Sequence, residues 1–140
     1  MTEAASIFKV LSDDTRLRVL NVLLTTEASL CVCEITDALQ VPQYQASKHL
    51  FLLRSMGLVN AERSGTWVYY SLSKDRGSNR RLFEFLRGYL SDESFAVDRE
   101  GILQRLRRRK GGKCVIGFVP VNRSRKPVLA RTKRERENAV

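Results

Sequence analysis

The fold of this chain is constrained most by a Val41-Pro42 break between two short amphipathic segments. Apolar residues recur at intervals of three and four on both sides of the break, which is the period of a helix: Ile35, Ala38 and Leu39 before it, and Ala46, Leu50 and Leu53 after it. Proline suits the first turn of a helix but ends a preceding one. We therefore predict one helix over residues 33–39 and a second over residues 43–56, with Gly57 as its C-cap.

A β-hairpin is predicted directly after this helix pair. Residues 58–63 and 66–72 flank Ser64-Gly65 with aromatic and β-branched side chains, most of them in 66–72, and Ser64-Gly65 suits a tight turn. The helical period also recurs elsewhere, in residues 3–11, 14–25, 78–90 and 95–109. Helix, break, helix and Gly-tipped hairpin is the order of a winged helix-turn-helix. We therefore predict a mainly α fold with a small β-hairpin wing.

The second helix of such a pair lies in the major groove of DNA, with its N-terminal residues on base edges. Here the polar side of that helix carries Gln43, Tyr44, Gln45, Ser47 and Lys48. Glutamine can pair bidentately with adenine, while serine and lysine suit bases or phosphates. The tip of the wing would place Arg63, Ser64 and Thr66 near the DNA backbone or the minor groove. These residues predict binding to double-stranded DNA.

Other conspicuous side chains of this region are predicted to pack rather than to bind. His49 is the sole histidine of the chain. We interpret it as a packed, hydrogen-bonded helix residue and not as a metal ligand or a base contact. Trp67, Tyr69 and Tyr70 are likewise expected in the core of the wing strands rather than stacked on bases.

Cys31 and Cys33 stand one residue apart, directly ahead of the helix pair. Thiolates are soft ligands and select thiophilic ions. A helix N-terminus also lowers a thiol pKa, so we expect reactive sulfurs. Residues two apart in an ideal helix are rotated by about 200°, so both thiols can bind one ion only if the helix start is unwound or distorts. The pair predicts a soft-ion sensor that deforms the entry to the helix-turn-helix.

The charge of the chain is concentrated at its C-terminal end. The net charge is +10 over 140 residues; residues 101–140 hold 13 Lys/Arg and 2 Asp/Glu (net +11), and residues 1–100 hold 12 and 13 (net −1). A basic tail attracts nucleic acid without reading its sequence. We therefore predict a DNA-binding and dimerisation domain over residues 1–92, followed by a partly disordered basic extension over residues 93–140.

No membrane segment is expected, because no run of about 18 apolar residues occurs. The N-terminal residues also lack the basic and apolar regions of a signal peptide. We therefore expect a cytoplasmic protein, in which three cysteines are more consistent with ligands, redox groups or core residues than with a disulfide framework.

Three segments carry a family resemblance: residues 8–20 (FKVLSDDTRLRVL), residues 47–54 (SKHLFLLR), and Gly57-Leu58-Val59 leading to residues 65–70 (GTWVYY). On these segments the chain resembles the ArsR/SmtB family of metal-responsive repressors, over residues 4–90. Residues 30–34 (LCVCE) are similar to the arsenic-responsive branch. Two departures stand out. Asp14 occupies a position where many members have proline, and Thr36 one where arsenic-responsive relatives often carry a third cysteine.

The resemblance implies a homodimer in which the first and fifth helices pair, setting two recognition helices on a palindromic operator. It also implies repression without inducer and release of DNA on inducer binding. The implied inducer is trivalent arsenic, As(III), with antimony, Sb(III), as a second candidate, and no cofactor is required. A stripe on the helix predicted over residues 78–90 is interpreted as dimer contact or core: Leu82, Phe85, Leu86 and Tyr89.

A third thiol is needed because trivalent arsenic favours three thiolates, and Cys31 and Cys33 supply two. Cys114 is the only other thiol and follows Gly111-Gly112-Lys113, a flexible cationic segment that could bring it to the pair, within one subunit or across the dimer. Cys31, Cys33 and Cys114 are therefore the candidate metal ligands. Two alternatives stay open: a hydroxide or small thiol as third ligand, or cysteines that serve only as small apolar residues.

Other functions also stay open. The same scaffold could sense cadmium or lead, although a four-sulfur cadmium site would need thiols shared between subunits. It could sense oxidation through a sulfenic acid or a disulfide. A small thiol-dependent enzyme is the remote alternative. We expect no enzyme, because the sequence lacks a Gly-rich phosphate loop, a Ser/His/Asp set and a two-residue-spaced redox cysteine motif.

Overall fold

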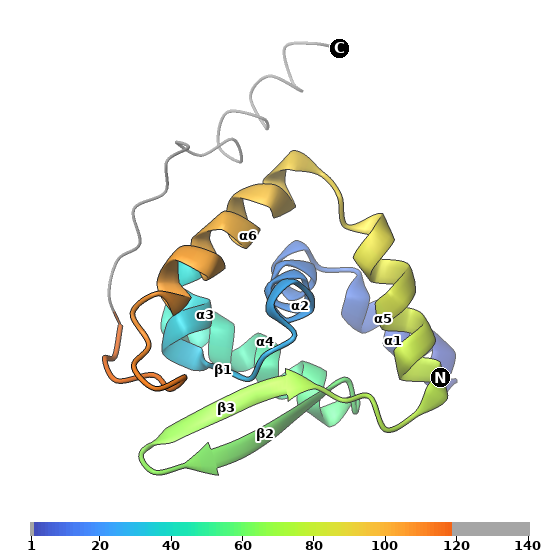
Figure 1. Ribbon diagram of the computed structural model, residues 1–140. Helices are drawn as coiled ribbons and strands as arrows, with labels where there is room; N and C mark the ends of the chain where they lie inside the picture. The colour runs from blue at the N-terminus through green and yellow to red at the C-terminus, as the bar shows by residue number, and fades with distance from the viewer. Residues whose placement is uncertain (1, 119–140) are drawn as a thin grey trace.

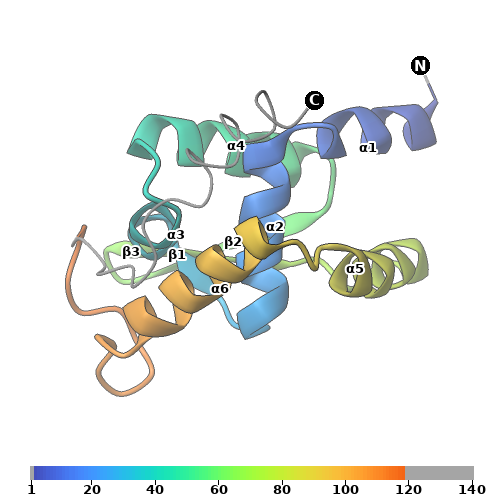
Figure 2. The same cartoon turned by 90° about the horizontal axis from the view of Figure 1, so that it is seen from above.

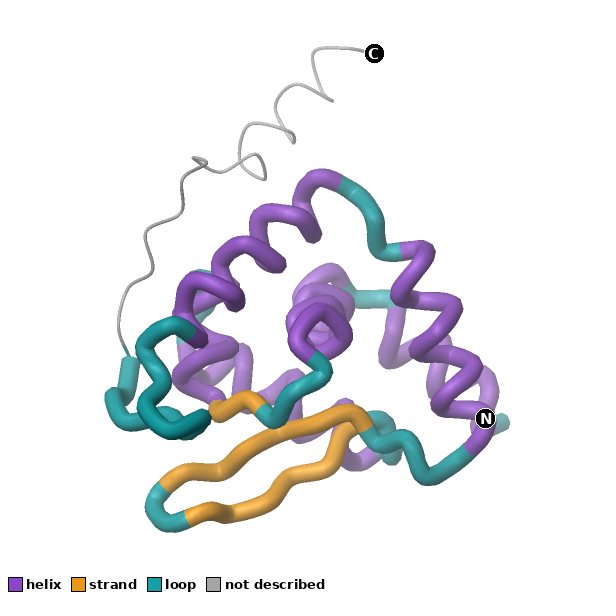
Figure 3. Tube along the Cα trace, in the orientation of Figure 1, coloured by secondary structure: helices purple, strands orange, loops and turns teal. Residues whose placement is uncertain are grey.

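Six helices and a three-stranded sheet form the described part of the computed structural model, residues 2–118 (Figures 1 and 3). The helices are α1 (Glu3–Leu11), α2 (Asp14–Thr26), α3 (Val32–Leu39), α4 (Gln43–Ser55), α5 (Gly77–Tyr89) and α6 (Glu93–Leu106); the strands are β1 (Leu30–Cys31), β2 (Val59–Ser64) and β3 (Trp67–Leu72). Every predicted helix and both predicted hairpin strands are present. The mainly α, winged helix-turn-helix fold class is therefore confirmed.

The central helix is α2, which contacts each of the other described helices (Figure 2). It begins where the Asp13 carboxylate accepts the backbone N–H of Arg16 at 3.0 Å, an N-cap that satisfies a donor left open at a helix start. Four of its apolar side chains are fully buried: Val19, Leu20, Val22 and Leu23. They belong to the main hydrophobic core, with the other helices packed around α2.

The helix-turn-helix pair is α3 and α4, separated at the predicted break. α3 ends at Gln40, whose φ of 55° is left-handed, and Pro42 precedes the first turn of α4 with φ −60° and ψ 145°. Gly57 follows α4 with φ 74°, a conformation that glycine adopts without strain. Local backbone preferences therefore set both ends of α4.

The sheet contains one strand more than the sequence analysis predicts. Strand order is β1-β3-β2, all antiparallel, and β1 pairs Leu30 with Tyr70 and Cys31 with Tyr69. A strand of two residues is too short to show an alternating pattern. It forms because β3 has a free edge beside it, and that edge exists only once the chain has folded.

The hydrophobic core continues beyond residue 92, the predicted domain boundary. α6 packs against α2 and α3 and buries Val97 and Ile102. Arg18 of α2 binds both carboxylate oxygens of Asp98, at 2.7 and 3.0 Å. Residues 93–106 therefore belong to the folded domain, because their apolar face completes the core rather than facing solvent.

The remainder of the predicted basic extension divides in two. Residues 107–118 form a loop that returns to the core, and residues 119–140 lie outside the described residues. Among the residues described, no helix is long and apolar enough to cross a membrane.

Candidate functional site

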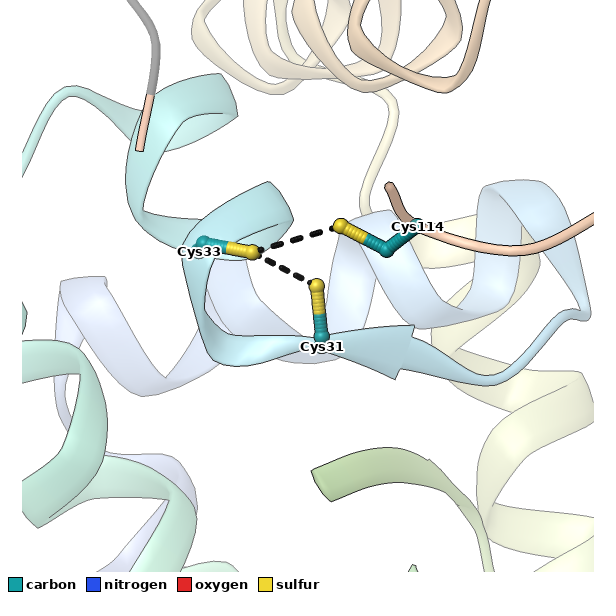
Figure 4. Close-up of side chains that lie close together, drawn as sticks. All are labelled: Cys31, Cys33 and Cys114. Carbon is teal, nitrogen blue, oxygen red and sulfur yellow. Dashed lines mark hydrogen bonds between the residues drawn. The ribbon is translucent and has the colours of Figure 1, made fainter. Parts of the chain in front are cut away.

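Cys31 and Cys33 converge because the boundary between β1 and α3 falls between them. Cys31 is the N-cap of α3 with an extended backbone (φ −82°, ψ 161°), and Cys33 lies in the first helical turn. Their sulfurs are 2.7 Å apart (Figure 4). The helix start is thus unwound at Cys31, which is the condition imposed by the rotation of about 200° between residues two apart in a helix.

Cys114 completes a cluster of three thiols. Its sulfur is 3.6 Å from that of Cys33, and all three sulfurs lie within 4.8 Å of one another (Figure 4). The loop after α6 brings it there through a turn in which Lys110 pairs with Lys113 and both intervening glycines have positive φ. The three side chains are at most 3% exposed, so the cluster is shielded from solvent.

Strand β3 forms one side of the thiol cluster. Trp67 and Tyr69 pack against the three cysteines. The backbone N–H of Cys114 donates a hydrogen bond of 3.1 Å to Tyr69 Oη. The prediction that these aromatic residues pack is consistent with this arrangement, but their partner is the thiol cluster as well as the wing.

Glu34 and Arg109 hold the pair of thiols in place. Arg109 donates to both Glu34 carboxylate oxygens, at 2.6 and 2.7 Å, and Glu34 accepts the backbone N–H of Cys31 at 3.0 Å. Burial acts to raise the pKa of Glu34, but the guanidinium and the N–H outweigh it and the pKa is lowered. The charged carboxylate therefore links the N-cap of α3 to the loop that carries Cys114.

Arg105 makes a second buried link. Its Nε donates to Asp37 at 2.8 Å, and its Nη2 donates to the carbonyl of Gly117 at 2.7 Å and lies 3.9 Å from the Cys33 sulfur. Burial acts to lower the pKa of Arg105, but the hydrogen bond and the charge of the Asp37 carboxylate outweigh burial, so the pKa is raised. The guanidinium is therefore a permanent buried cation beside the thiols.

Three residues of this site were not predicted from the sequence: Glu34, Arg105 and Arg109. Glu34 carried a signal, since a glutamate three residues after an N-cap is typical of a capping box. Arg105 and Arg109 carried none, because they stand among further arginines and only the fold separates buried from exposed ones.

Two of the thiols are less acidic than a free cysteine. A hydrogen bond to Cys33 and burial raise the pKa of the Cys31 thiol, and burial raises the pKa of the Cys114 thiol. At neutral pH both groups are protonated, so a thiophilic ion must displace protons to bind.

The residues predicted to contact DNA lie at the surface or close to it. On α4, Gln43, Tyr44, Ser47 and Lys48 are exposed and Gln45 is half-buried; in the wing, Arg63 and Thr66 are exposed and Ser64 is half-buried. His49 is buried, and its Nδ1 lies 3.3 Å from the Arg16 guanidinium. The placement of these side chains is compatible with the predicted DNA contacts, which stay predictions.

α1 and α5 carry large exposed aromatic side chains. Phe8, Phe85 and Tyr89 are 67%, 60% and 68% exposed, and the rings of Phe85 and Tyr89 stack with centroids 5.1 Å apart. Leu86 is buried and Leu82 packs against the core. One side of α5 therefore packs into the core, and its other side presents an exposed apolar surface.

Fold and site together define a winged helix-turn-helix protein with a buried three-thiol cluster at the entry to its helix pair. Residues 13–61 match the family described as bacterial regulatory protein, arsR family. The chain is 46% identical over 74 residues to an uncharacterized HTH-type transcriptional regulator, MJ1325, of Methanocaldococcus jannaschii, covering 53% of this chain and 82% of that protein. The chain belongs to the ArsR family of transcriptional regulators, which are not enzymes.

Two further relatives carry different names. The chain is 48% identical over 66 residues to the arsenic resistance transcriptional regulator ArsR1 of Pseudomonas putida, covering 47% of this chain and 51% of that one. It is 40% identical over 73 residues to a cadmium resistance transcriptional regulatory protein CadC homolog of Staphylococcus aureus, covering 52% and 60%. The chain thus spans about half the length of each of these two relatives.

A solved structure supports the fold independently. It is the homodimeric winged helix-turn-helix DNA-binding domain of Mb0332 from Mycobacterium bovis, a possible ArsR-family transcriptional regulator. That domain is 30% identical with a TM-score of 0.55, covering 65% of this chain and 81% of that one.

Proposed function

We propose that this protein is a repressor that binds operator DNA as a homodimer and leaves it when trivalent arsenic binds Cys31, Cys33 and Cys114. The observation that carries the proposal is the convergence of three buried thiol sulfurs within 4.8 Å. One of them comes from a loop 81 residues away in the sequence. Packing alone does not require three thiols to share one contact.

The donor set favours a trivalent thiophilic ion over cadmium. Among the described residues, this cluster holds sulfur donors only, without histidine or carboxylate ligands. Soft sulfur donors disfavour hard ions. Trivalent arsenic is satisfied by three thiolates, whereas a four-sulfur cadmium site would need a thiol from the second subunit. Trivalent antimony has the same requirement as arsenic and is the second candidate.

Dimerisation is supported by the aromatic surface on α1 and α5 and by the homodimeric relative. Exposed apolar surface of this kind is typical of protein–protein interaction sites. In a two-fold dimer, the two copies of α4 would read the two halves of a palindromic operator.

Release of DNA requires that arsenic bind the DNA-free state more tightly than the DNA-bound one. Moving the population from 1:99 to 99:1 takes about 5.5 kcal/mol of differential affinity. Covalent-strength bonds to three thiolates can supply this if the DNA-bound state does not let all three form. The site also lies where it can act, because Cys33 is in the first turn of α3, the first helix of the DNA-binding pair.

The proposal is tested by fluorescence-anisotropy binding to the DNA upstream of the gene, under reductant, with arsenite titrated. We expect arsenite to release the wild type, and not Cys31→Ser or Cys33→Ser. Loss of release in Cys114→Ser would establish the third ligand. Tight DNA binding that arsenite leaves unchanged would refute the arsenic proposal, and cadmium, lead and peroxide would then be titrated in turn.

A rescue variant distinguishes loss of a ligand from loss of structure. Thr36 lies three residues after Cys33 on α3, so their Cβ atoms lie about 5–6 Å apart on one helix surface. Threonine and cysteine are close in size. Adding Thr36→Cys to Cys114→Ser should therefore restore release by arsenite if the defect of Cys114→Ser is a missing thiol.

The short contact between the Cys31 and Cys33 sulfurs also favours a second candidate function, oxidation as the signal. The two functions separate by condition. Metalloid sensing operates under reductant, whereas oxidant sensing predicts release by peroxide and recovery with dithiothreitol.

A further inference from the structure

The wing is joined to the thiol cluster by two side chains of β3. Tyr69 stands opposite Cys31 in the β1–β3 register, and its Oη accepts the N–H of Cys114. The Arg109 guanidinium lies 5.7 Å above the Tyr69 ring. Tyr69 is thus paired with Cys31 at the start of α3 and also contacts Arg109 and Cys114, which follow α6.

Trp67 extends this connection to the tip of the wing. Its side chain packs against the cysteine cluster, and its backbone pairs with Ser64 of β2, the last pair before the Gly65 turn. Of the wing residues predicted to contact DNA, Ser64 is thus its strand partner and Thr66 precedes it in the sequence. A displacement at the cluster therefore has a continuous path of packed groups to the wing tip.

Cys114 is the one ligand of the three that lies in a loop, where its thiol donates to the Ile116 carbonyl at 3.0 Å. Cys31 is held by the Glu34 carboxylate at the N-cap, and Cys33 by the first turn of α3. Cys114 follows the Gly111-Gly112 turn, and its backbone N–H is bound to Tyr69. An adjustment of the three sulfurs around one ion is therefore expected at Cys114, and the hydrogen bond passes it to β3.

We propose that ligand binding at the thiol cluster controls DNA affinity through the wing, with Tyr69 as the positioning residue that couples Cys114 to β3. The inference rests on the proposed function in assigning an ion to the cluster. It goes further by naming the wing, and not displacement of α4, as the element that loses its DNA contact.

The test compares the full-length wild type with Tyr69→Phe, and uses Tyr70→Phe as the matched control. Tyr69→Phe keeps the ring beneath Arg109 and removes the acceptor of the Cys114 N–H. Tyr70 is the next residue of β3 and packs against the main core instead. Trp67 is the single tryptophan of the chain, so its fluorescence reports arsenite binding in all three proteins.

All three proteins should bind arsenite and, without it, bind DNA with equal affinity. In the wild type, arsenite should weaken DNA binding by a factor in the usual range for coupled sites, about 5–150-fold. We expect this factor to fall below about a third of the wild-type value in Tyr69→Phe. It should stay at the wild-type value in Tyr70→Phe. Hydrogen exchange should show arsenite altering the amides of residues 59–72 in the wild type and not in Tyr69→Phe.

Two results would overturn the inference. One is release of Tyr69→Phe by arsenite with the wild-type factor. The other is a change in amide exchange confined to α3 and α4 while Trp67 fluorescence shows that arsenite is bound. Failure of the proposed function gives a different pattern, in which the wild type keeps its DNA at saturating arsenite. In that case control of DNA affinity by arsenite is refuted, and amide exchange in residues 59–72 decides separately whether Tyr69 couples Cys114 to β3.

Discussion

Replacing Arg109 by leucine should destabilise this protein far more than the same change one residue earlier. Arg109 donates to both oxygens of Glu34, whose side chain is fully buried, and its Nη2 also donates to the Ser29 carbonyl at 2.6 Å. Arg109→Leu leaves that carboxylate in the interior beside the Cys31 N–H, without the cation that balances its charge. Arg108 is exposed, so Arg108→Leu is the matched control.

The magnitude follows from the burial of Glu34. Removing one partner of a buried ion pair costs about 3–5 kcal/mol, because the remaining charge stays desolvated. An exposed substitution such as Arg108→Leu changes stability by about 0.5 kcal/mol or less. Replacing both partners of a buried pair is often close to neutral, so Glu34→Leu with Arg109→Leu should be more stable than Arg109→Leu alone. The Cys31 N–H left without an acceptor offsets part of that recovery, by about 1–3 kcal/mol.

The assay is urea unfolding followed by circular dichroism, with all variants at one protein concentration because the stability of a dimer depends on it. We expect an Arg109→Leu free energy of unfolding about 3 kcal/mol or more below that of Arg108→Leu. A difference under about 1 kcal/mol, the size of a surface ion pair, would refute the reasoning that a buried carboxylate holds the loop against α3.

Three further predictions follow from the packing. Gly101→Ala should lower the free energy of unfolding by about 1–3 kcal/mol, because the new Cβ would lie 2.9 Å from the Ala38 carbonyl oxygen. Gly88→Ala should instead stabilise α5, because its new Cβ would have no heavy atom within 4 Å. Equal effects of the two substitutions would contradict the close approach of α6 to α3. Burial lowers the pKa of His49 below 6.5, so the unfolded chain binds the proton more readily and the free energy of unfolding decreases as pH falls through that value. His49→Gln should therefore flatten the dependence of this free energy on pH between pH 6.5 and 5. An unchanged slope would exclude His49 as its source. Phe85→Glu places a charge on the exposed aromatic surface of α5 and should shift the molecular mass in solution toward the monomer, measured by light scattering against the wild type; an unchanged mass would remove this surface from the dimer interface.

Periodicity was sufficient for most of the fold because each element carries its own signal. The apolar residues of α3 and α4, the Val41-Pro42 break and the Gly65 turn are local features, and local backbone preferences decide them. β1 was missed because two residues show no period, and its pairing with β3 depends on an edge that exists only after folding. The boundary placed at residue 92 was too early, since the apolar residues of α6 do not reveal whether they face a core or a partner.

The sequence by itself determined the helix-turn-helix with its wing, the surface residues of α4 and the proximity of Cys31 to Cys33 along the chain. Only the tertiary structure decided that the Cys31 and Cys33 sulfurs lie 2.7 Å apart, that Cys114 joins the pair, and that Arg105 is buried and Arg109 half-buried beside it. The reason is one of range. Hydrophobic period and turn chemistry act over a few residues, whereas a contact between residues 81 positions apart depends on how α6 packs on α3 and where its following loop returns.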